Sequence, residues 1–196
     1  MELAAQTHLT LAEYNQLEEE TNTRYEYHHG EVFAMAGAAT DVGNPKHSLI
    51  ANNAGGLLRS ALLSKNCAVF NSDAKYHVAS LNKSFYPDVS VVCGPIERSE
   101  KDIRALANPI LLVEVLSKST EGYDKGNKFK DYGHLASLQE YVLIEQDQPL
   151  VQTFYRSSPD ALWQMRWFQP EDDEVVLQSV GVSLKLADLY HKTEGL

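Results

Sequence analysis

The apolar positions of this 196-residue chain recur with two periods, and their order along the chain predicts a mixed α/β fold. Apolar residues spaced by three and four predict helices over about 10–20, 45–63 and 124–135, and a short helix at the C-terminal end. Short apolar or alternating runs between and after these helices predict strands. The predicted strands cover residues 24–27, 31–35, 67–71, 74–78, 85–93, 110–116, 139–145, 150–156, 162–168, 175–179 and 182–186.

Local signals mark the residues at which the helices begin. Thr10 and Glu13 form a capping box at the start of the first helix. Asn44 followed by Pro45 supplies an N-cap and a first-turn proline for the second helix. Asp124 can cap the third helix. These caps fix the predicted helix starts more tightly than the apolar spacing does.

Helices interleaved with strands, followed by a β-rich tail, predict an α/β (α+β mixed) domain around a central mixed sheet flanked by helices. The strand–helix–strand unit over 110–145 predicts a right-handed crossover between parallel neighbours. We expect one domain over residues 1–196, with its core in about 9–147. Residues 148–196 are expected to complete the sheet or to form a dimer contact.

Composition is that of an ordinary globular protein, with 43% hydrophobic and 22% charged residues. No apolar run approaches the ~20 residues that a membrane helix needs. The N-terminus lacks the pattern of a secretory signal. The two cysteines form no Cys-x-x-Cys pair, and Cys93 is expected to be a free thiol at the end of a buried strand. These features predict a protein of the reducing cytoplasm, with no membrane partner.

The net charge of −10 is unevenly distributed along the chain. Residues 1–40 hold seven acids and one base (−6), and residues 139–196 hold ten acids and four bases (−6). Residues 41–138 hold ten acids and twelve bases (+2), so a phosphate-bearing partner is compatible with the middle of the chain. The alternative is that acidic flanks only keep the protein in solution.

Two carboxylates stand in apolar strands. Glu114 lies inside the run 110–116, and Asp88 follows Pro87 at the start of another apolar run. An unpaired carboxylate in a dry strand is costly, so both acids are expected to share a cation. The alternatives are a strand-start aspartate that closes a turn and, for Glu114, a structural ion pair with a core arginine or lysine.

Lys128 is the third candidate. It lies on the inward stripe of the predicted helix with Phe129 and Tyr132, so it is expected to point towards the Glu114 strand. Two carboxylates and a lysine around one point suit Mg²⁺ chemistry on a phosphodiester. The alternatives are that Lys128 only neutralises Glu114, or that its stem covers the sheet edge with the ammonium in water.

The same residues resemble a known pattern. Pro87-Asp88 followed by Glu114 is similar to the PD-(D/E)XK nuclease superfamily, and the closer context resembles the Uma-two family of restriction endonucleases. The resemblance covers about Leu9 to Asp147. The stretches that carry it are Tyr86–Val92, Val113–Ser117, Thr120, Tyr123-Asp124, Lys128, Tyr132 and Glu140-Tyr141, with Tyr25-Glu26, Gly30-Glu31, Met35–Gly37 and His47 in the N-terminal part.

The resemblance implies a restriction-endonuclease-like core and a metal site. The superfamily lysine is expected two positions after the acid, where Leu116 stands, so Lys128 is the matching position. The backbone carbonyl of Val115 is implied as a further ligand. Glu31 is a candidate for another carboxylate ligand, with an exposed hairpin glutamate as the alternative. His47 is expected to be a core or cap-region histidine.

The function implied is a Mg²⁺- (or Mn²⁺-) dependent endonuclease acting on DNA as a homodimer, with Asp88, Glu114 and Lys128 as catalytic residues. The main alternative is a non-catalytic binding or regulatory module of the same fold, which the net acidity and the lack of a basic run favour. A third function, hydrolysis of a smaller phosphate ester, has weaker support because the chain has no glycine-rich phosphate loop.

Overall fold

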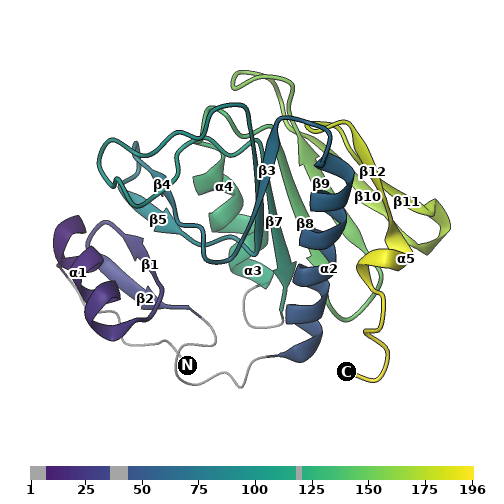
Figure 1. Cartoon of the computed structure of the whole chain (residues 1–196), viewed down its shortest axis with the longest axis horizontal. Helices are drawn as coiled ribbons and strands as arrows, with labels where there is room; N and C mark the ends of the chain where they lie inside the picture. Colours follow the sequence, from purple (N-terminus) through teal and green to yellow (C-terminus); the bar gives the residue numbers. More distant parts are fainter. Residues whose placement is uncertain (1–7, 36–43, 118–120) are drawn as a thin grey trace.

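A computed structural model describes residues 8–35, 44–117 and 121–196, and within them two sheets hold most of the strands (Figure 1). The six-stranded sheet has the order β10-β9-β8-β7-β6-β3, and the four-stranded sheet has the order β2-β1-β5-β4. The strands of the larger sheet are β3 (Cys67–Asn71), β6 (Val89–Cys93), β7 (Leu111–Leu116), β8 (Glu140–Glu145), β9 (Val151–Tyr155) and β10 (Gln164–Phe168). Those of the smaller sheet are β1 (Tyr25–His28), β2 (Glu31–Ala34), β4 (Tyr76–Val78) and β5 (Lys83–Phe85).

The larger sheet is mixed, as predicted. β7 and β8 are parallel neighbours, and the other pairs in this sheet are antiparallel. The remaining elements are α1 (Leu11–Thr21), α2 (Pro45–Leu62), α3 (Glu121–Tyr123), the π-helical turn η1 (Asp124–Lys128), α4 (Phe129–Tyr132), the 3₁₀ turn η2 (Pro170–Asp172), β11 (Glu174–Leu177), β12 (Val182–Lys185) and α5 (Leu186–Leu189).

Helices cover both faces of the larger sheet (Figure 1). The buried face of α2 packs on one side of β7, against Val113 and Val115. The segment that includes α4 packs on the other side, where Tyr132 meets Leu112 and Leu116. The two faces of β7 alternate because successive side chains of a strand point in opposite directions. Glu114 therefore faces the α4 side.

The predicted caps are present. Thr10 and Glu13 exchange hydrogen bonds in the capping box of α1. At the start of α2, the Asn44 side chain accepts from the backbone N–H groups of Lys46 and His47, at 3.0 and 3.4 Å. This cap fixes the first turn of α2, and with it the position of His47.

Two predicted elements are divided in the structure. The apolar run over 85–93 separates into β5 and β6, which belong to different sheets, because Pro87 has no N–H to continue a ladder. The predicted helix over 124–135 begins earlier, contains the π-helical turn η1 and ends at Tyr132. π-Helical turns within helices are frequent at functional sites.

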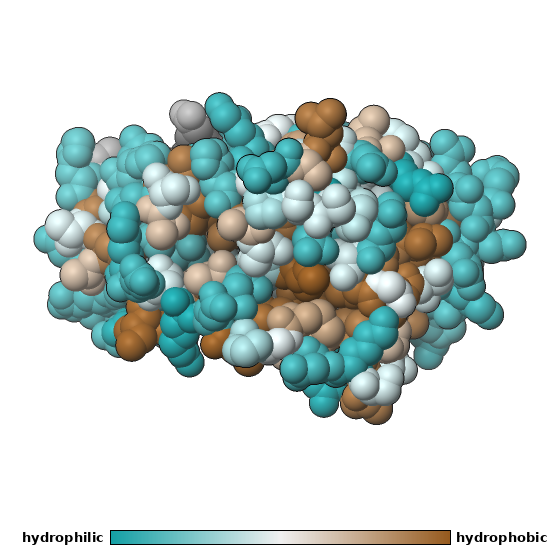
Figure 2. All heavy atoms as spheres, turned by 90° about the horizontal axis from the view of Figure 1, so that it is seen from above, coloured by the Kyte–Doolittle hydropathy of each residue, from teal (hydrophilic) through white to brown (hydrophobic). Residues whose placement is uncertain are grey.

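The C-terminal tail has two parts. β9 and β10 extend the larger sheet beyond β8. β11 and β12 form a separate hairpin, which packs with α5 against α2. Seen from above, hydrophilic side chains cover both ends of the molecule and hydrophobic ones gather in a patch between them (Figure 2).

The two cysteines form a disulfide, so the prediction of a free thiol at Cys93 is wrong. Cys67 on β3 lies directly opposite Cys93 on β6 in the antiparallel register, with their Cα atoms 4.0 Å apart. The pair is 26 residues apart in sequence, and only the strand register brings it together. Within the described residues, no helix is long and apolar enough to cross a membrane.

Candidate active site

Asp88 and Glu114 line one cavity of about 200 Å³. Asp88 directly precedes β6, and Glu114 lies in the neighbouring strand β7. The Asp88 carboxylate accepts a hydrogen bond from the backbone N–H of Val115 at 2.8 Å. This bond holds Asp88 against the strand that carries Glu114, so the structure brings together the two acids that the sequence singled out.

Glu114 is nearly inaccessible to solvent, with 4% exposure. Burial raises the pKa of Glu114 well above its usual range, and the nearby carboxylates of Asp88 and Asp124 raise it further. The Lys128 ammonium at 3.0 Å opposes this rise. The Tyr132 hydroxyl donates to the same carboxylate at 2.8 Å, which fixes its orientation.

Lys128 ends the π-helical turn and points into the cavity, among acids. Its ammonium lies 3.0 Å from Glu114, 3.2 Å from Glu26 and 3.4 Å from Asp124. Burial lowers the pKa of Lys128, but Glu114 and Glu26 together raise it well above its usual range. The side chain is 8% exposed, so the alternative of an ammonium in bulk water is wrong.

Glu26 is a fourth acid at the site, and it was not among the residues predicted to bind metal or to act in catalysis. It lies on β1 in the smaller sheet and accepts a hydrogen bond from the Tyr123 hydroxyl at 3.0 Å. Burial favours a raised pKa for Glu26, but Lys128 and His28 outweigh it and lower the pKa to about 2. Its signal in the sequence is the alternation of a strand, which places Glu26 on the face opposite Tyr25 and Tyr27.

We expect Glu26→Gln to destabilise the metal-free protein. The change of the Glu26 pKa from 4.5 to about 2 on folding corresponds to about 3 kcal/mol of stability. This stability is present above pH 4.5 and is lost as the pH falls towards 2. The difference between Glu26→Gln and wild type should therefore be largest near neutral pH and shrink in acid. Urea unfolding in EDTA at a series of pH values measures it.

Glu31→Gln is the matched control, because Glu31 is exposed on the neighbouring strand β2. Its unfolding free energy should follow that of wild type at every pH. A difference between Glu26→Gln and wild type that does not change with pH would contradict the ionised state of Glu26.

His47 reaches the cavity from the first turn of α2. The sequence predicts a core or cap-region histidine here. The structure places His47 in the first turn of α2 with its ring towards Asp88, Nε2 lying 3.3 Å from the carboxylate. Burial lowers the pKa of His47, but Asp88 and the Val115 backbone together raise it. No spacing signal in the sequence connects His47 to Asp88, because the contact depends on how α2 crosses the sheet.

The two remaining predicted ligands differ in position. Val115 lines the cavity next to Asp88 and Glu114. Glu31 is exposed in β2 and is not among the residues that line the cavity. Glu26, on the neighbouring strand β1, lines the cavity on the side where Glu31 was predicted to lie.

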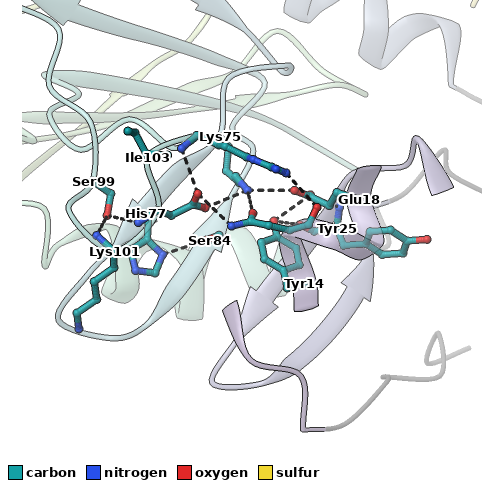
Figure 3. Close-up of polar contacts among 12 residues, drawn as sticks. Tyr14, Glu18, Tyr25, Lys75, His77, Ser84, Ser99, Lys101 and Ile103 are labelled. Carbon is teal, nitrogen blue, oxygen red and sulfur yellow. Dashed lines mark hydrogen bonds and ion pairs between the residues drawn. The ribbon is translucent and has the colours of Figure 1, made fainter. Parts of the chain in front are cut away.

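A second buried cluster holds the N-terminal elements in place beside the site (Figure 3). The Lys75 ammonium, on a side chain 4% exposed, lies 3.0 Å from Glu18 of α1 and 2.9 Å from Asp102. Glu18 also accepts from the hydroxyl of Tyr86, which lines the cavity, at 2.8 Å. These contacts hold α1 against Tyr86, which lies two residues before Asp88. The hairpin that carries Glu26 contacts α1 in turn, through the hydrogen bond from the Tyr14 hydroxyl to the Tyr25 carbonyl at 2.8 Å.

The donor set of the cavity fits a hard divalent cation. Four acids line it, against one lysine (1 − 4 = −3 with His47 neutral): Glu26, Asp88, Glu114 and Asp124, with Lys128. Within the described residues, no three or more His, Cys, Asp or Glu side chains are arranged as a metal centre. Mg²⁺ does not need such a cage, because it binds through one or two carboxylates and keeps several waters. Asp88 and Glu114 are the carboxylates on adjacent strands.

Comparison with known proteins identifies the family. The model of the Uma2 family, described as "Putative restriction endonuclease", matches residues 11–187. The chain belongs to the Uma2 family. This confirms the resemblance drawn from the Asp88, Glu114 and Lys128 context, and the match extends past Asp147 into the C-terminal tail.

Two relatives and one solved structure are similar over most of their length. The uncharacterized proteins slr1290 and sll1609 of Synechocystis sp. are each 34% identical, over 93% and 85% of this chain and 91% of each relative. The crystal structure of a putative nuclease belonging to DUF820 from Anabaena variabilis has a TM-score of 0.71 at 22% identity, covering 93% of this chain and 97% of that chain. The likeness confirms the predicted fold class, a central mixed sheet flanked by helices.

Proposed function

We propose that this Uma2 family protein is a metal-dependent endonuclease that hydrolyses phosphodiester bonds in DNA. The observation that supports the proposal is the meeting of Asp88, Glu114 and Lys128 at one cavity in a chain of a nuclease-related family. Two carboxylates on adjacent strands and a buried ammonium provide the two charge types that phosphodiester hydrolysis needs.

Different residues of the site would bind the metal ion and stabilise the charge on the phosphate. Asp88 and Glu114, with the backbone carbonyl of Val115, would hold Mg²⁺ or Mn²⁺. When bound, such an ion polarises the phosphodiester and lowers the pKa of a bound water. Lys128 stays protonated because its pKa is raised, so it orients the attacking water and offsets charge on the scissile phosphate, and is a poor base at neutral pH.

His47 and Glu26 support these groups. His47 lies against the Asp88 carboxylate and limits the orientations that it can take. Glu26 and Glu114 hold the Lys128 ammonium from two sides. The Tyr123 hydroxyl fixes the Glu26 carboxylate in turn. Buried partners of this kind keep a catalytic side chain in one geometry before the substrate arrives.

Plasmid nicking tests the proposal. We expect wild-type protein to nick supercoiled DNA with Mg²⁺ or Mn²⁺ and not with EDTA, and Asp88→Asn to be slower by at least about a hundredfold because it removes a ligand charge. Asp160→Asn, an exposed change in the C-terminal part, is the control and should nick like wild type. Equal nicking by wild type and Asp88→Asn would contradict the assignment.

A non-catalytic binding module is the second candidate, and the net charge of −10 favours it. Such a module would associate with a partner without metal-dependent cleavage, and its binding would not respond to substitution of Glu114.

The homodimer expected from the sequence stays a prediction. The edge strand β10 leaves Met165 and Trp167 exposed (53% and 46%), and a second copy could cover them.

A further inference from the structure

A groove of about 830 Å³ runs between α2 and β3 and opens onto the candidate active site. His47 and Asp88 line both the groove and the catalytic cavity. The groove therefore continues the cavity along the surface. The proposed chemistry uses the end of the groove at His47 and Asp88, and has no role for the part that reaches Arg59.

One side of the groove is a polar face of α2. Ser48, Asn52, Gly56 and Arg59 follow one another by four, four and three residues, so they lie along one side of the helix. The core-facing side of α2 is separate and carries Ile50, Ala54, Leu58 and Leu62. From Ser48 to Arg59 the face is about 17 Å long at ~1.5 Å per residue.

Glycine leaves the middle of this face open. A Cβ added at Gly56 would meet no atom within 4 Å, and one at Gly55 would meet only Val89 at 3.7 Å. Both glycines stand inside a helix, where glycine costs stability relative to alanine. Helix formation does not require them there, and both line the groove.

The charge of the groove differs from that of the molecule. Its lining holds Arg24 and Arg59 against Asp88, a balance of +1 (2 − 1) with His47 neutral, in a chain of net charge −10. The hollow beside α5 has a balance of −2, from Lys46 against Asp147, Asp173 and Glu194.

Arg59 is the cation that can bind a ligand in this groove. Arg24 is held by the Ser72 backbone carbonyl at 2.6 Å and by Asp73 at 2.9 Å. Arg59 is exposed, and among the residues that the structure describes its side chain makes no hydrogen bond or ion pair. A free guanidinium at the end of a groove is suited to a phosphate.

The other side of the groove is β3, an edge strand that, within the part of the chain that the structure describes, pairs with β6 alone. An edge strand presents backbone N–H and C=O groups without a strand partner. Backbone N–H groups and polar side chains are common contacts to nucleic-acid phosphates and sugars. Residues 69–72, on and just after β3, line the groove opposite the polar face of α2, so contacts of this sequence-independent kind are available from both sides.

We propose that this groove carries one strand of a nucleic acid to the active site, with Arg59 bound to a phosphate. The proposal rests on the proposed nuclease function and specifies how its substrate lies. For a strand with the duplex rise of ~3.4 Å per nucleotide, the length from Ser48 to Arg59 corresponds to about five nucleotides. The strand enters either alone or as part of a duplex.

Binding and cleavage are measured separately to test this. Fluorescence anisotropy with labelled 20-nucleotide single strands and duplexes, in EDTA so that no cleavage occurs, gives the dissociation constant at several salt concentrations. Arg59→Ala should raise Kd about five- to tenfold and reduce the slope of log K against log salt by about one. The probe with the larger effect shows whether the strand enters alone or within a duplex.

Arg166→Ala is the matched control, because Arg166 is an exposed arginine on β10, at the opposite edge of the sheet. Gly56→Leu adds a bulky side chain at a position that lines the groove and where a Cβ meets no atom within 4 Å, and it should weaken binding at least as much as Arg59→Ala. Gly56→Ala should bind like wild type, and the pair separates blockage from any change in the helix.

The outcomes distinguish the groove from the nuclease function. If wild type binds and nicks DNA, and Arg59→Ala and Gly56→Leu behave like it, the groove proposal is overturned while the site assignment stands. If binding depends on Arg59 but no metal-dependent nicking occurs, the groove holds and the nuclease function fails. If wild type binds neither probe, the groove proposal fails, and nicking in Mg²⁺ still decides the nuclease function by itself.

Discussion

Glu114→Gln is expected to abolish cleavage, by roughly a thousandfold or more, without unfolding the protein. A ligand that holds a catalytic cation contributes several kcal/mol to transition-state stabilisation, and about 4 kcal/mol corresponds to a thousandfold in rate. Stability should change little, because burial disfavours the charged form of Glu114, Lys128 keeps Glu26 and Asp124 as partners, and glutamine keeps the acceptor for the Tyr132 hydroxyl. Nicking rates in Mg²⁺ and urea unfolding of the metal-free protein measure the two effects.

Glu140→Gln is the control with the opposite expectation. Glu140 is fully buried on the neighbouring strand β8, but its carboxylate binds Gln178 and Ser179 and does not line the cavity. This variant should lose stability, because both Glu140 oxygens accept from backbone N–H groups and the NH₂ of glutamine cannot accept, and it should keep its nicking activity. Loss of cleavage in both variants to the same degree would show that any buried change on these strands stops the enzyme, and the assignment of Glu114 would fall.

Much of the fold could be predicted because the local signals agree with the tertiary structure. The capping box at Thr10 and the N-cap at Asn44 mark α1 and α2. Both helices begin within one residue of the predicted starts. The strand that carries Glu114 stands out by its apolar run, which is typical of a strand buried on both faces. Periodicity could not assign each strand to one of the two sheets, because that depends on contacts far apart in sequence.

At the site, too, contacts between residues close in sequence could be predicted, and contacts between distant residues could not. Glu114 and Lys128 are 14 residues apart on consecutive elements, and an inward helix stripe is enough to bring them together. Glu26 meets Lys128 only because β1 pairs with β5, a non-local pairing that the spacing of residues does not encode. The Cys67–Cys93 disulfide was missed for a related reason, since a strand register shifted by one residue would separate the two thiols.

The amino-acid sequence contains one weak indication of the π-helical turn η1. Gly126 lies inside the predicted helix, where it lowers helix propensity. Asp124 and Lys128, at the two ends of this turn, both line the cavity. A regular helix over the same residues would bury the same apolar side chains, so hydrophobic spacing could not distinguish the two.

Lys128→Met is expected to cost both stability and activity. Among the described residues that line the catalytic cavity, Lys128 is the one lysine or arginine. Its ammonium pairs with Glu26, which is ionised with a pKa of about 2. Removing one partner of a buried ion pair leaves an uncompensated charge and costs roughly 3–5 kcal/mol. Cleavage should fall by about 10²–10³-fold, the usual effect of removing one charge-stabilising donor. Lys130→Met, an exposed change on α4, should alter neither.

The double variant Glu26→Gln/Lys128→Met separates the two losses. Its stability should exceed that of Lys128→Met, because a neutral amide at position 26 does not need the ammonium, and contacting residues couple by up to about 3 kcal/mol. Its activity should stay as low as that of Lys128→Met, because the phosphate still lacks a cation. A double-mutant cycle of urea unfolding with parallel nicking rates gives both quantities. Recovery of cleavage together with stability would mean that Lys128 acts only by holding the fold, and its catalytic assignment would then be wrong.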